Sequence, residues 1–324
     1  MSESVAAVVV TYNRARLLLE CLSGLLNQSR TLEKIIVIDN ASTDGTQGIL
    51  EARGYLTNDK VDYVRVAENS GGAGGFYTGV KRGFEFGFDW LWLMDDDAEP
   101  KTDSLELMIP AFIDSETVAV ANLVVGIDSR PQYSHRGWLD LKSTSMQVVR
   151  CIAEADLSKN SRLTFASFVG LAIRTSVIPL IGLPKKEFFI HGDDFEYCCR
   201  ISSIGNIVLN PNSVILHKDH QKAGMETRVV MGRSSVRVPL DKLWLRYYGL
   251  RNLIWLRRRE CGPRTALRFI LKRVIATAMG VLLYDDHKVI RLRFWFHAFV
   301  DGWCGIFDNA KPKRLTNIPA RVGR

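Results

Sequence analysis

Two groups of carboxylates, about 100 positions apart, are the residues of this chain best suited to chemistry. The first is Asp95, Asp96 and Asp97, which directly follow the apolar run Trp-Leu-Trp-Leu-Met. Three adjacent carboxylates repel one another unless a positive charge neutralises them. Closely spaced aspartate oxygens suit Mg²⁺ or Mn²⁺, which commonly bridge to substrate phosphates. The pattern indicates a cation site, and a solvated acidic turn after a strand is the alternative.

The second group is Asp193, Asp194 and Glu196, between an aromatic stretch and a helix-like stretch at 196–203. An aspartate at this point could simply cap the helix. A cap accounts for one carboxylate and leaves the other two unexplained. His217 follows further along, at the end of a short strand-like run. A lone histidine is more often structural, but the polar run after it (218–220) favours a role as a ligand.

The elements that must position these groups are read from apolar patterns. Apolar strands are expected at 5–10, 34–38, 90–94 and 118–125, a strand that alternates apolar and polar residues at 61–66, and helices at 15–28 and 75–86. Strand, helix and strand joined by short loops predict a parallel sheet and an α/β fold. The aspartate triplet comes at the carboxyl end of a strand, where open α/β sheets bind their ligands.

A glycine-rich stretch, Asn-Ser-Gly-Gly-Ala-Gly-Gly-Phe, occupies 69–76. It is not a dinucleotide-binding fingerprint, because that motif follows the first strand of its fold. Here the first strand is followed by Thr-Tyr-Asn-Arg, and the glycines come two crossovers later. The stretch predicts a close approach of the backbone to a ligand, or a tight helix start without one.

Composition places the chain among ordinary globular proteins, with 47% apolar and 24% charged residues. Six scattered cysteines without a CxxC pair argue against a zinc site or a disulfide framework and fit a reducing cytoplasm. The N-terminus shows no secretory signal pattern. The last 84 residues, 241–324, hold 18 Lys/Arg and 6 Asp/Glu. This basic segment predicts an anionic partner, namely a membrane surface, a nucleic acid or a phosphorylated acceptor.

The same C-terminal segment predicts helices at 242–259, 266–284 and 291–303. The uncharged stretch 274–284 is 11 residues long, and a membrane span needs about 20. We therefore expect a core or interfacial helix. Arginines among aromatic residues can also hold single-stranded nucleic acid, but no recognised nucleic-acid module is present. Two domains are expected, 1–240 and 241–324.

Taken in order, the motifs resemble the family 2 glycosyltransferases of the GT-A fold. The closer likeness is to bacterial galactofuranosyltransferases that start a galactan on a lipid-linked acceptor. The stretches that carry it are TYNR (11–14), IDNAST (38–43), NSGGAGGF (69–76), WLWLMDDD (90–97), FIHGDDFE (189–196), His217 and YYGLRN (247–252). The likeness covers roughly 5–255 and implies a GT-A, Rossmann-like, mostly parallel sheet flanked by helices, followed by a basic helical C-terminal region.

The resemblance implies a role for each matching residue. The uracil and ribose of a nucleotide-sugar would be held by Thr11, Asn13 and Asp39, with Asn69 and Gly74 as further donor contacts. A divalent metal, Mn²⁺ or Mg²⁺, would be held with the donor diphosphate by Asp95, Asp97 and His217. Asp96 would face the sugar or ribose.

On the acceptor side, the resemblance makes Asp194 the catalytic base, and Asp193 and Glu196 would orient the acceptor. Gly192 departs from the family, in which a tryptophan often precedes the acidic pair. His220 is an alternative metal ligand to His217.

The resemblance implies an inverting, metal-dependent transferase at the cytoplasmic face of a bacterial membrane, peripheral to it. It would move galactofuranose from UDP-galactofuranose to a polyprenyl-diphosphate-linked glycan in cell-wall or surface polysaccharide synthesis, without a nucleic-acid partner and with homo-oligomers possible. Three rival hypotheses are a rhamnosyltransferase using dTDP-rhamnose, a nucleotide-sugar-binding protein without turnover, and a nucleic-acid-binding protein.

Overall fold

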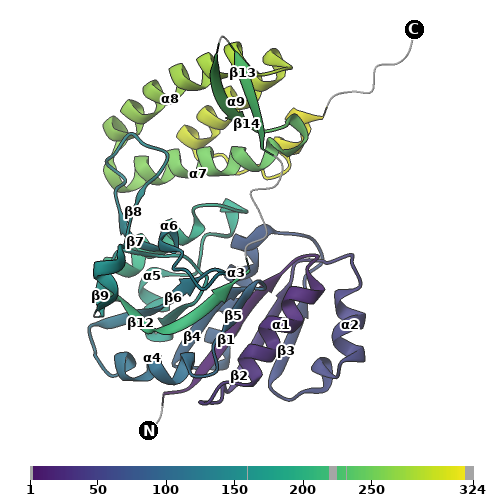
Figure 1. The fold of residues 1–324 in the computed structure, drawn as a ribbon, viewed down its shortest axis with the longest axis vertical. Helices are drawn as coiled ribbons and strands as arrows, with labels where there is room; N and C mark the ends of the chain where they lie inside the picture. The colour runs from purple at the N-terminus through teal and green to yellow at the C-terminus, as the bar shows by residue number, and fades with distance from the viewer. Residues whose placement is uncertain (1–2, 159, 219–224, 231, 318–324) are drawn as a thin grey trace. The chain divides into compact units, whose positions relative to one another are not determined.

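The structure is a computed structural model that describes residues 3–158, 160–218, 225–230 and 232–317 (Figure 1). The chain divides into two compact units. The first unit consists of Met1–Leu139, Val149–Phe189 and Asp193–Asp219. The second unit consists of Asp140–Val148, Ile190–Gly192 and His220–Arg324. The functional boundary expected after residue 240 stays a prediction.

A mixed sheet forms the centre of the first unit (Figure 1). Its strand order is β3-β2-β1-β4-β11-β6-β12-β5, with β9 paired to β12. The strands are β1 Val5–Thr11, β2 Lys34–Asp39, β3 Val61–Arg65, β4 Trp90–Asp95, β5 Ala98–Pro100, β6 Thr117–Val125, β9 Ser161–Leu163, β11 Leu171–Arg174 and β12 Asn206–His217. Neighbours from β3 to β4 are parallel, as are β6 and β12, whereas β11 runs antiparallel between β4 and β6. The expected α/β fold with its mostly parallel sheet is confirmed.

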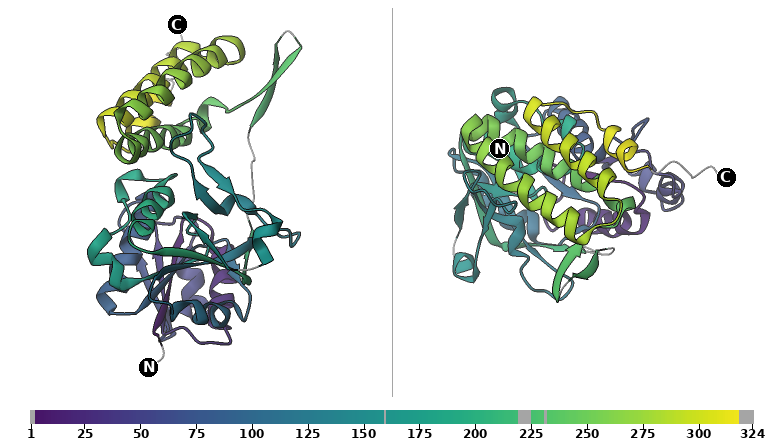
Figure 2. Two further views of the ribbon diagram at one scale, coloured as in Figure 1. Left: turned by 90° about the vertical axis from the view of Figure 1, so that its left-hand side faces the viewer. Right: turned by 90° about the horizontal axis from the view of Figure 1, so that it is seen from above.

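Helices cover both faces of this sheet (Figures 1 and 2). They are α1 Ala15–Leu26, α2 Thr46–Ala52, α3 Gly71–Phe86, α4 Ser104–Phe112, α5 Ile178–Ile181 and α6 Asp193–Ser202. Phe76 of α3 and Tyr197 of α6 belong to the core on one face, and Leu22 of α1 and Met108 of α4 belong to the core on the other. Because both faces are buried, the central strands β1, β4 and β6 are nearly continuous apolar runs rather than alternating ones.

Glycines let α3 lie directly against the sheet. A Cβ atom on Gly75 would lie 2.4 Å from Val10 Cγ1, and one on Gly79 would lie 2.3 Å from Val8 Cγ1. The helix starts at Gly71, four positions before the predicted start. Gly71 has a φ of +73°, and its Cβ would lie 2.0 Å from the carbonyl oxygen of Phe189. At these glycines the α3 backbone closely approaches other parts of the protein, namely strand β1 and the backbone of Phe189.

Two stretches differ in detail from the sequence prediction. The apolar stretch 165–173 is interrupted at Gly170, whose φ is +75°, and forms β10 Phe165–Ala166 and β11. With β7 Arg136–Leu139 and β8 Val149–Cys151, β10 makes a small separate sheet. The short strands expected at 207–209 and 214–216 form the single strand β12, with a bulge between them.

The second unit is helical, with a two-stranded hairpin (Figure 2). Its elements are β13 Glu226–Val230, β14 Arg233–Arg237, α7 Trp244–Cys261, α8 Pro263–Tyr284, α9 Lys288–Cys304 and α10 Lys311–Thr316. Helix α7 packs against both α8 and α9. The helical C-terminal region expected from the sequence is confirmed. In the part of the chain that the structure describes, no helix is long and apolar enough to cross a membrane.

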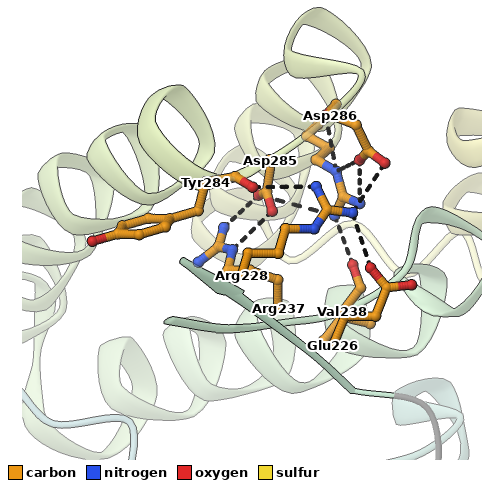
Figure 3. Close-up of polar contacts among 8 residues, drawn as sticks. Glu226, Arg228, Arg237, Val238, Tyr284, Asp285 and Asp286 are labelled. Atoms are coloured by element: carbon orange, nitrogen blue, oxygen red, sulfur yellow. Dashed lines mark hydrogen bonds and ion pairs between the residues drawn. The ribbon is translucent and has the colours of Figure 1, made fainter. Parts of the chain in front are cut away.

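Ion pairs join the hairpin to the turn between α8 and α9 (Figure 3). Arg237 Nε donates to Asp285 Oδ1 at 2.8 Å, and Arg228 Nη2 lies 3.1 Å from Asp286 Oδ2. Arg291 of α9, which is fully buried, lies 2.8 Å from Asp286 Oδ1. These contacts fix one face of the hairpin against the helices.

Candidate active site

The carboxyl ends of four parallel strands bring polar residues into one row at the edge of the sheet. In the strand register Thr11 pairs with Asp39, Asp39 pairs with Arg65, and Val10 pairs with Asp95. This edge is where open α/β sheets bind their ligands. The aspartate triplet, which starts at the last residue of β4, therefore lies beside the loops that follow β1 and β2.

Asp96 is buried and is held by the loop that follows β1. Thr11 Oγ1 donates to Asp96 Oδ2 at 2.7 Å, and Arg14 Nη1 lies 3.3 Å from Asp96 Oδ1. Burial raises the pKa of Asp96 to about 6, although both partners favour the charged carboxylate. Arg14 thus supplies part of the positive charge that the triplet requires. Its role was not predicted from the sequence.

Asp97 and His217 meet because β12 pairs with β5, with His217 opposite Ala98. His217 Nε2 lies 3.5 Å from Asp97 Oδ1, which is too long for a strong hydrogen bond. That buried oxygen has no hydrogen-bond partner among the described residues. Arg14 Nη1 lies 2.8 Å from the other oxygen, Oδ2. Burial alone would raise the pKa of Asp97, but His217 and Arg14 outweigh it and the pKa is lowered.

A divalent cation fits the chemistry of these donors. Carboxylate oxygens and an imidazole nitrogen are ligands that Mn²⁺ accepts, and a cation would satisfy the buried oxygen of Asp97. Two ligands each about 2.1 Å from one ion lie about 3–4 Å apart, and Asp97 Oδ1 and His217 Nε2 are separated by 3.5 Å. Among the described residues, no three His, Cys, Asp or Glu side chains are grouped as a metal site, and the expected part of Asp95 in holding the ion stays a prediction.

Gln132 orients the imidazole of His217. Its Oε1 lies 2.8 Å from His217 Nδ1, an arrangement in which Nδ1 carries the proton and Nε2 faces Asp97. The ring of His135 packs edge-on against that of His217, with 4.8 Å between centroids. Sequence reasoning missed Gln132 and His135, which lie in a segment without a clear pattern. The alternative ligand, His220, lies outside the described residues.

The second acidic group opens helix α6 in the same unit. Burial raises the pKa of Asp193 to about 8, and the charge of Asp194 adds to this. Burial also raises the pKa of Asp194, to about 6. A carboxyl with a pKa near 6 is charged at neutral pH and still a useful proton acceptor.

The two acidic groups interact electrostatically across the first unit. Burial is the largest cause that raises the pKa of Asp95, and the charges of Asp97, Asp96 and Asp193 add to it. Four carboxylates from distant parts of the sequence therefore share one environment. Such a concentration of carboxyl groups with shifted pKa values is typical of a site that binds a cation or moves protons.

Within the described part of the chain, Glu196, unlike Asp193 and Asp194, is held in an ion pair within helix α6. It is buried, and Arg200 Nε donates to its Oε2 at 3.1 Å. Arg200 also donates to the carbonyl oxygen of Leu183 at 3.1 Å. These contacts tie the first turns of α6 to the chain after α5.

Asp39 and Asn13, which are expected to contact the nucleoside, make hydrogen bonds that hold the loops after β1 and β2 in place. Asp39 is fully buried and accepts hydrogen bonds from the backbone N–H of Ser42, at 2.8 Å, and from the hydroxyl of Tyr63. Burial, followed by this bond to Asp39, raises the pKa of Tyr63. Asn13 has a φ of +54°, and its Oδ1 accepts from the backbone N–H of Thr43 at 2.6 Å.

Residues of the glycine-rich stretch 69–76 likewise contact one another. Asn69 Oδ1 accepts from the backbone N–H of Gly71 at 2.8 Å, which shapes the start of α3. A Cβ atom on Gly74 would lie 2.3 Å from Ser70 Oγ, so a side chain there would displace the serine. Contacts of Asn69 and Gly74 with a donor stay predictions.

Comparison with known proteins agrees with this geometry. The profile of glycosyl transferase family 2 matches residues 6–175, which is more than half of the chain, so the protein belongs to that family. The chain is 28% identical over 211 residues to galactofuranosyltransferase GlfT1 of Mycolicibacterium smegmatis, covering 63% of this chain and 67% of the relative. It is 23% identical over 309 residues to dTDP-rhamnosyl transferase RfbF of Shigella flexneri, covering 94% of this chain and 97% of the relative.

Solved structures share the fold. GalNAc-T7, crystallised with UDP, GalNAc and Mn²⁺, matches with a TM-score of 0.57 at 15% identity, over 78% of this chain and 50% of that one. S. aureus TarS 1–349 in complex with UDP matches with a TM-score of 0.55 at 14% identity, over 92% of this chain and 80% of that one. The fold is GT-A-like, and the resemblance inferred from the sequence motifs is confirmed at the level of the family.

Proposed function

We propose that this family 2 glycosyltransferase is an inverting, metal-dependent enzyme that transfers galactofuranose from UDP-galactofuranose to a polyprenyl-diphosphate-linked glycan. The observation that supports the proposal is that Asp95 and Asp193 belong to one unit and interact electrostatically, because we assign diphosphate binding to the first acidic group and the base to the second. The likeness to GlfT1 supports the donor. The cytoplasmic face of a bacterial membrane is the proposed location.

In this proposal the first acidic group binds the donor. Asp97 and His217, with Asp95, would hold a divalent cation, and that cation would neutralise charge on the leaving diphosphate. Thr11 holds the buried carboxylate of Asp96 by a hydrogen bond, and this carboxylate would face the sugar or ribose. Arg14 offsets the negative charge of the triplet before the donor arrives.

The second acidic group acts on the acceptor. Asp194 takes the proton from the attacking hydroxyl, the hydroxyl oxygen forms the new bond to the anomeric carbon, and the bond to the UDP oxygen breaks with its electron pair. Attack in line with the leaving group inverts the anomeric carbon. Burial keeps the pKa of Asp194 at about 6, so that the carboxylate is charged at neutral pH and can accept the proton. Asp193 and Glu196 would orient the acceptor.

A donor screen tests this proposal. The full chain is incubated with Mn²⁺, a lipid-linked acceptor extract and either UDP-galactofuranose or dTDP-rhamnose, and nucleotide release is measured. We expect release of UDP from UDP-galactofuranose. Release from dTDP-rhamnose alone would favour the rhamnosyltransferase alternative, which is supported by the match to RfbF over nearly its whole length. Nucleotide-sugar binding with no release from any donor would favour the non-catalytic alternative.

A further inference from the structure

Helix α8 of the second unit exposes a row of large apolar side chains on its outward side. Phe269 and Val281 are buried, and they mark the inward side. The exposed apolar side chains recur at helical spacing and are called here the α8 outer face: Leu267, Leu271, Val274, Ile275, Met279, Leu282 and Leu283. Leu271, Ile275 and Met279 are 56–63% exposed. A contiguous apolar stripe of this kind marks an interaction surface.

The charges on the helix indicate what this surface meets. The sequence of α8 contains no Asp or Glu over its 22 residues. Its exposed charged residues are Arg264, Arg268 and Lys272, all in the N-terminal half beside the α8 outer face. A helix that combines exposed apolar side chains with cations and no anions suits the interface of an anionic bilayer. A symmetric pairing of two such faces would bring six exposed cations into one interface without a carboxylate from α8.

The hairpin formed by β13 and β14 also has one face packed against the protein and one exposed apolar face. Its ion-paired face holds Arg228 and Arg237 against the helix turn (Figure 3). In the hairpin register Thr227 pairs with Val236, and Val229 pairs with Ser234, so Val229 and Val236 share the opposite face. These valines are 65% and 58% exposed. The second unit thus exposes two further apolar side chains, on the hairpin, that could contact a binding partner.

We infer that the α8 outer face docks on an anionic lipid bilayer, with its apolar side chains in the headgroup–acyl boundary and its cations among the lipid headgroups. Such a helix lies in the plane of the interface and does not cross it. This inference goes beyond the transfer reaction, and it can be tested without donor or acceptor.

Vesicle flotation of the full chain tests the inference. The vesicles are phosphatidylcholine with or without phosphatidylglycerol. We expect flotation with the anionic vesicles and little with phosphatidylcholine alone. The triple variant L271Q/I275Q/M279Q should bind on the order of 10²-fold more weakly. The variant R264Q/R268Q/K272Q should lose the preference for anionic lipid.

A matched control is available in the first unit. Ile113, Ile127 and Leu180 are 64–78% exposed, and I113Q/I127Q/L180Q also removes three exposed apolar side chains. We expect this control to float like the wild type, and circular dichroism checks that each variant is folded. The inference is overturned if L271Q/I275Q/M279Q and the control I113Q/I127Q/L180Q bind the anionic vesicles equally. It is also overturned if the wild type forms a dimer that L271Q/I275Q/M279Q abolishes while flotation is unchanged.

Binding of UDP, measured by calorimetry on the same proteins, separates this inference from the proposed function. UDP binding retained in a protein that does not float would remove the docking inference alone. Flotation by a protein that binds no nucleotide would leave the docking inference standing and contradict the proposed function.

Discussion

Asp193 lies close enough to Asp95 for its charge to help raise the pKa of that carboxyl, although about 100 positions separate the two residues in the chain. Asp95 ends strand β4, Asp193 opens helix α6, and both belong to the first unit. The fold therefore brings carboxyl groups together, and a bound proton or a bound cation relieves the repulsion between their charged forms. The predictions below follow from this arrangement and from the way the fold supports it.

Stability should depend on pH through Asp193. Its pKa is about 8 in the folded protein, because of burial and the charge of Asp194, and about 4 in the unfolded chain. Between these values the folded protein holds a proton that the unfolded chain has lost. The free energy of unfolding therefore falls as the pH rises from about 4 to about 8.

The substitution Asp193→Asn removes the ionisable carboxyl, and with it the fall in the free energy of unfolding at high pH. At pH 8 we expect the variant to be more stable than the wild type by roughly 1–3 kcal/mol, with the difference shrinking toward pH 4. Urea unfolding at several pH values measures it. Asp59→Asn changes an exposed carboxylate in the same unit and should have almost no effect. A variant less stable than the wild type at every pH would show that burial of Asp193 is compensated in another way.

The rate of transfer should report the proton on Asp194. Its pKa of about 6, raised by burial, means that the base is protonated below that pH. We expect kcat to rise about tenfold per pH unit below pH 6 and to level off above it. A profile of kcat from pH 4.5 to 8 at saturating donor measures this. A rate that is flat across pH 6 would contradict a base with this pKa.

Gln132 should control metal binding through His217. Gln132→Leu removes the acceptor for His217 Nδ1, so the imidazole loses the contact that presents Nε2 to Asp97. Losing such an outer partner typically costs 10–100-fold in metal affinity, and we expect a loss on that order. Titration of Mn²⁺ followed by electron paramagnetic resonance measures it. Gln47→Leu, at an exposed position in α2, is the control. Equal affinities in the two variants would remove Gln132 from this role.

The glycines of α3 give a matched pair of stability variants. Gly79→Ala places a Cβ atom 2.3 Å from Val8 Cγ1, and we expect it to destabilise the fold by about 1–3 kcal/mol. Gly72→Ala, in the first turn of the same helix, meets no atom within 4 Å and should be neutral or stabilising by up to about 1 kcal/mol. Thermal or urea unfolding compares them. Equal effects would mean that α3 does not depend on this close approach.

The sequence predicted the central strands well, because burial on both faces makes β1, β4 and β6 nearly continuous apolar runs. The run before Asp95 and the run that ends at Asp39 both form strands, and their polar ends meet at one edge. The start of α3 was placed too late because glycines usually disfavour helices, and here Gly71 and Gly75 are required for packing.

The contacts that complete the site could not be read from the sequence. His217 reaches Asp97 only because β12 pairs with β5, a pairing between residues more than 100 positions apart. Gln132 and Arg14 act through side-chain contacts that leave no periodic pattern. The long-range pairing of strands, rather than any local motif, decides which polar side chains share the site.

The most direct test of the central claim is the rate of UDP release from UDP-galactofuranose by Asp194→Asn, with a lipid-linked acceptor present and Mn²⁺ supplied. We predict that donor binding stays near the wild-type level and that the rate falls by a factor on the order of 10²–10⁴. A rate equal to that of the wild type would contradict the account, because the second acidic group would then play no part in the transfer.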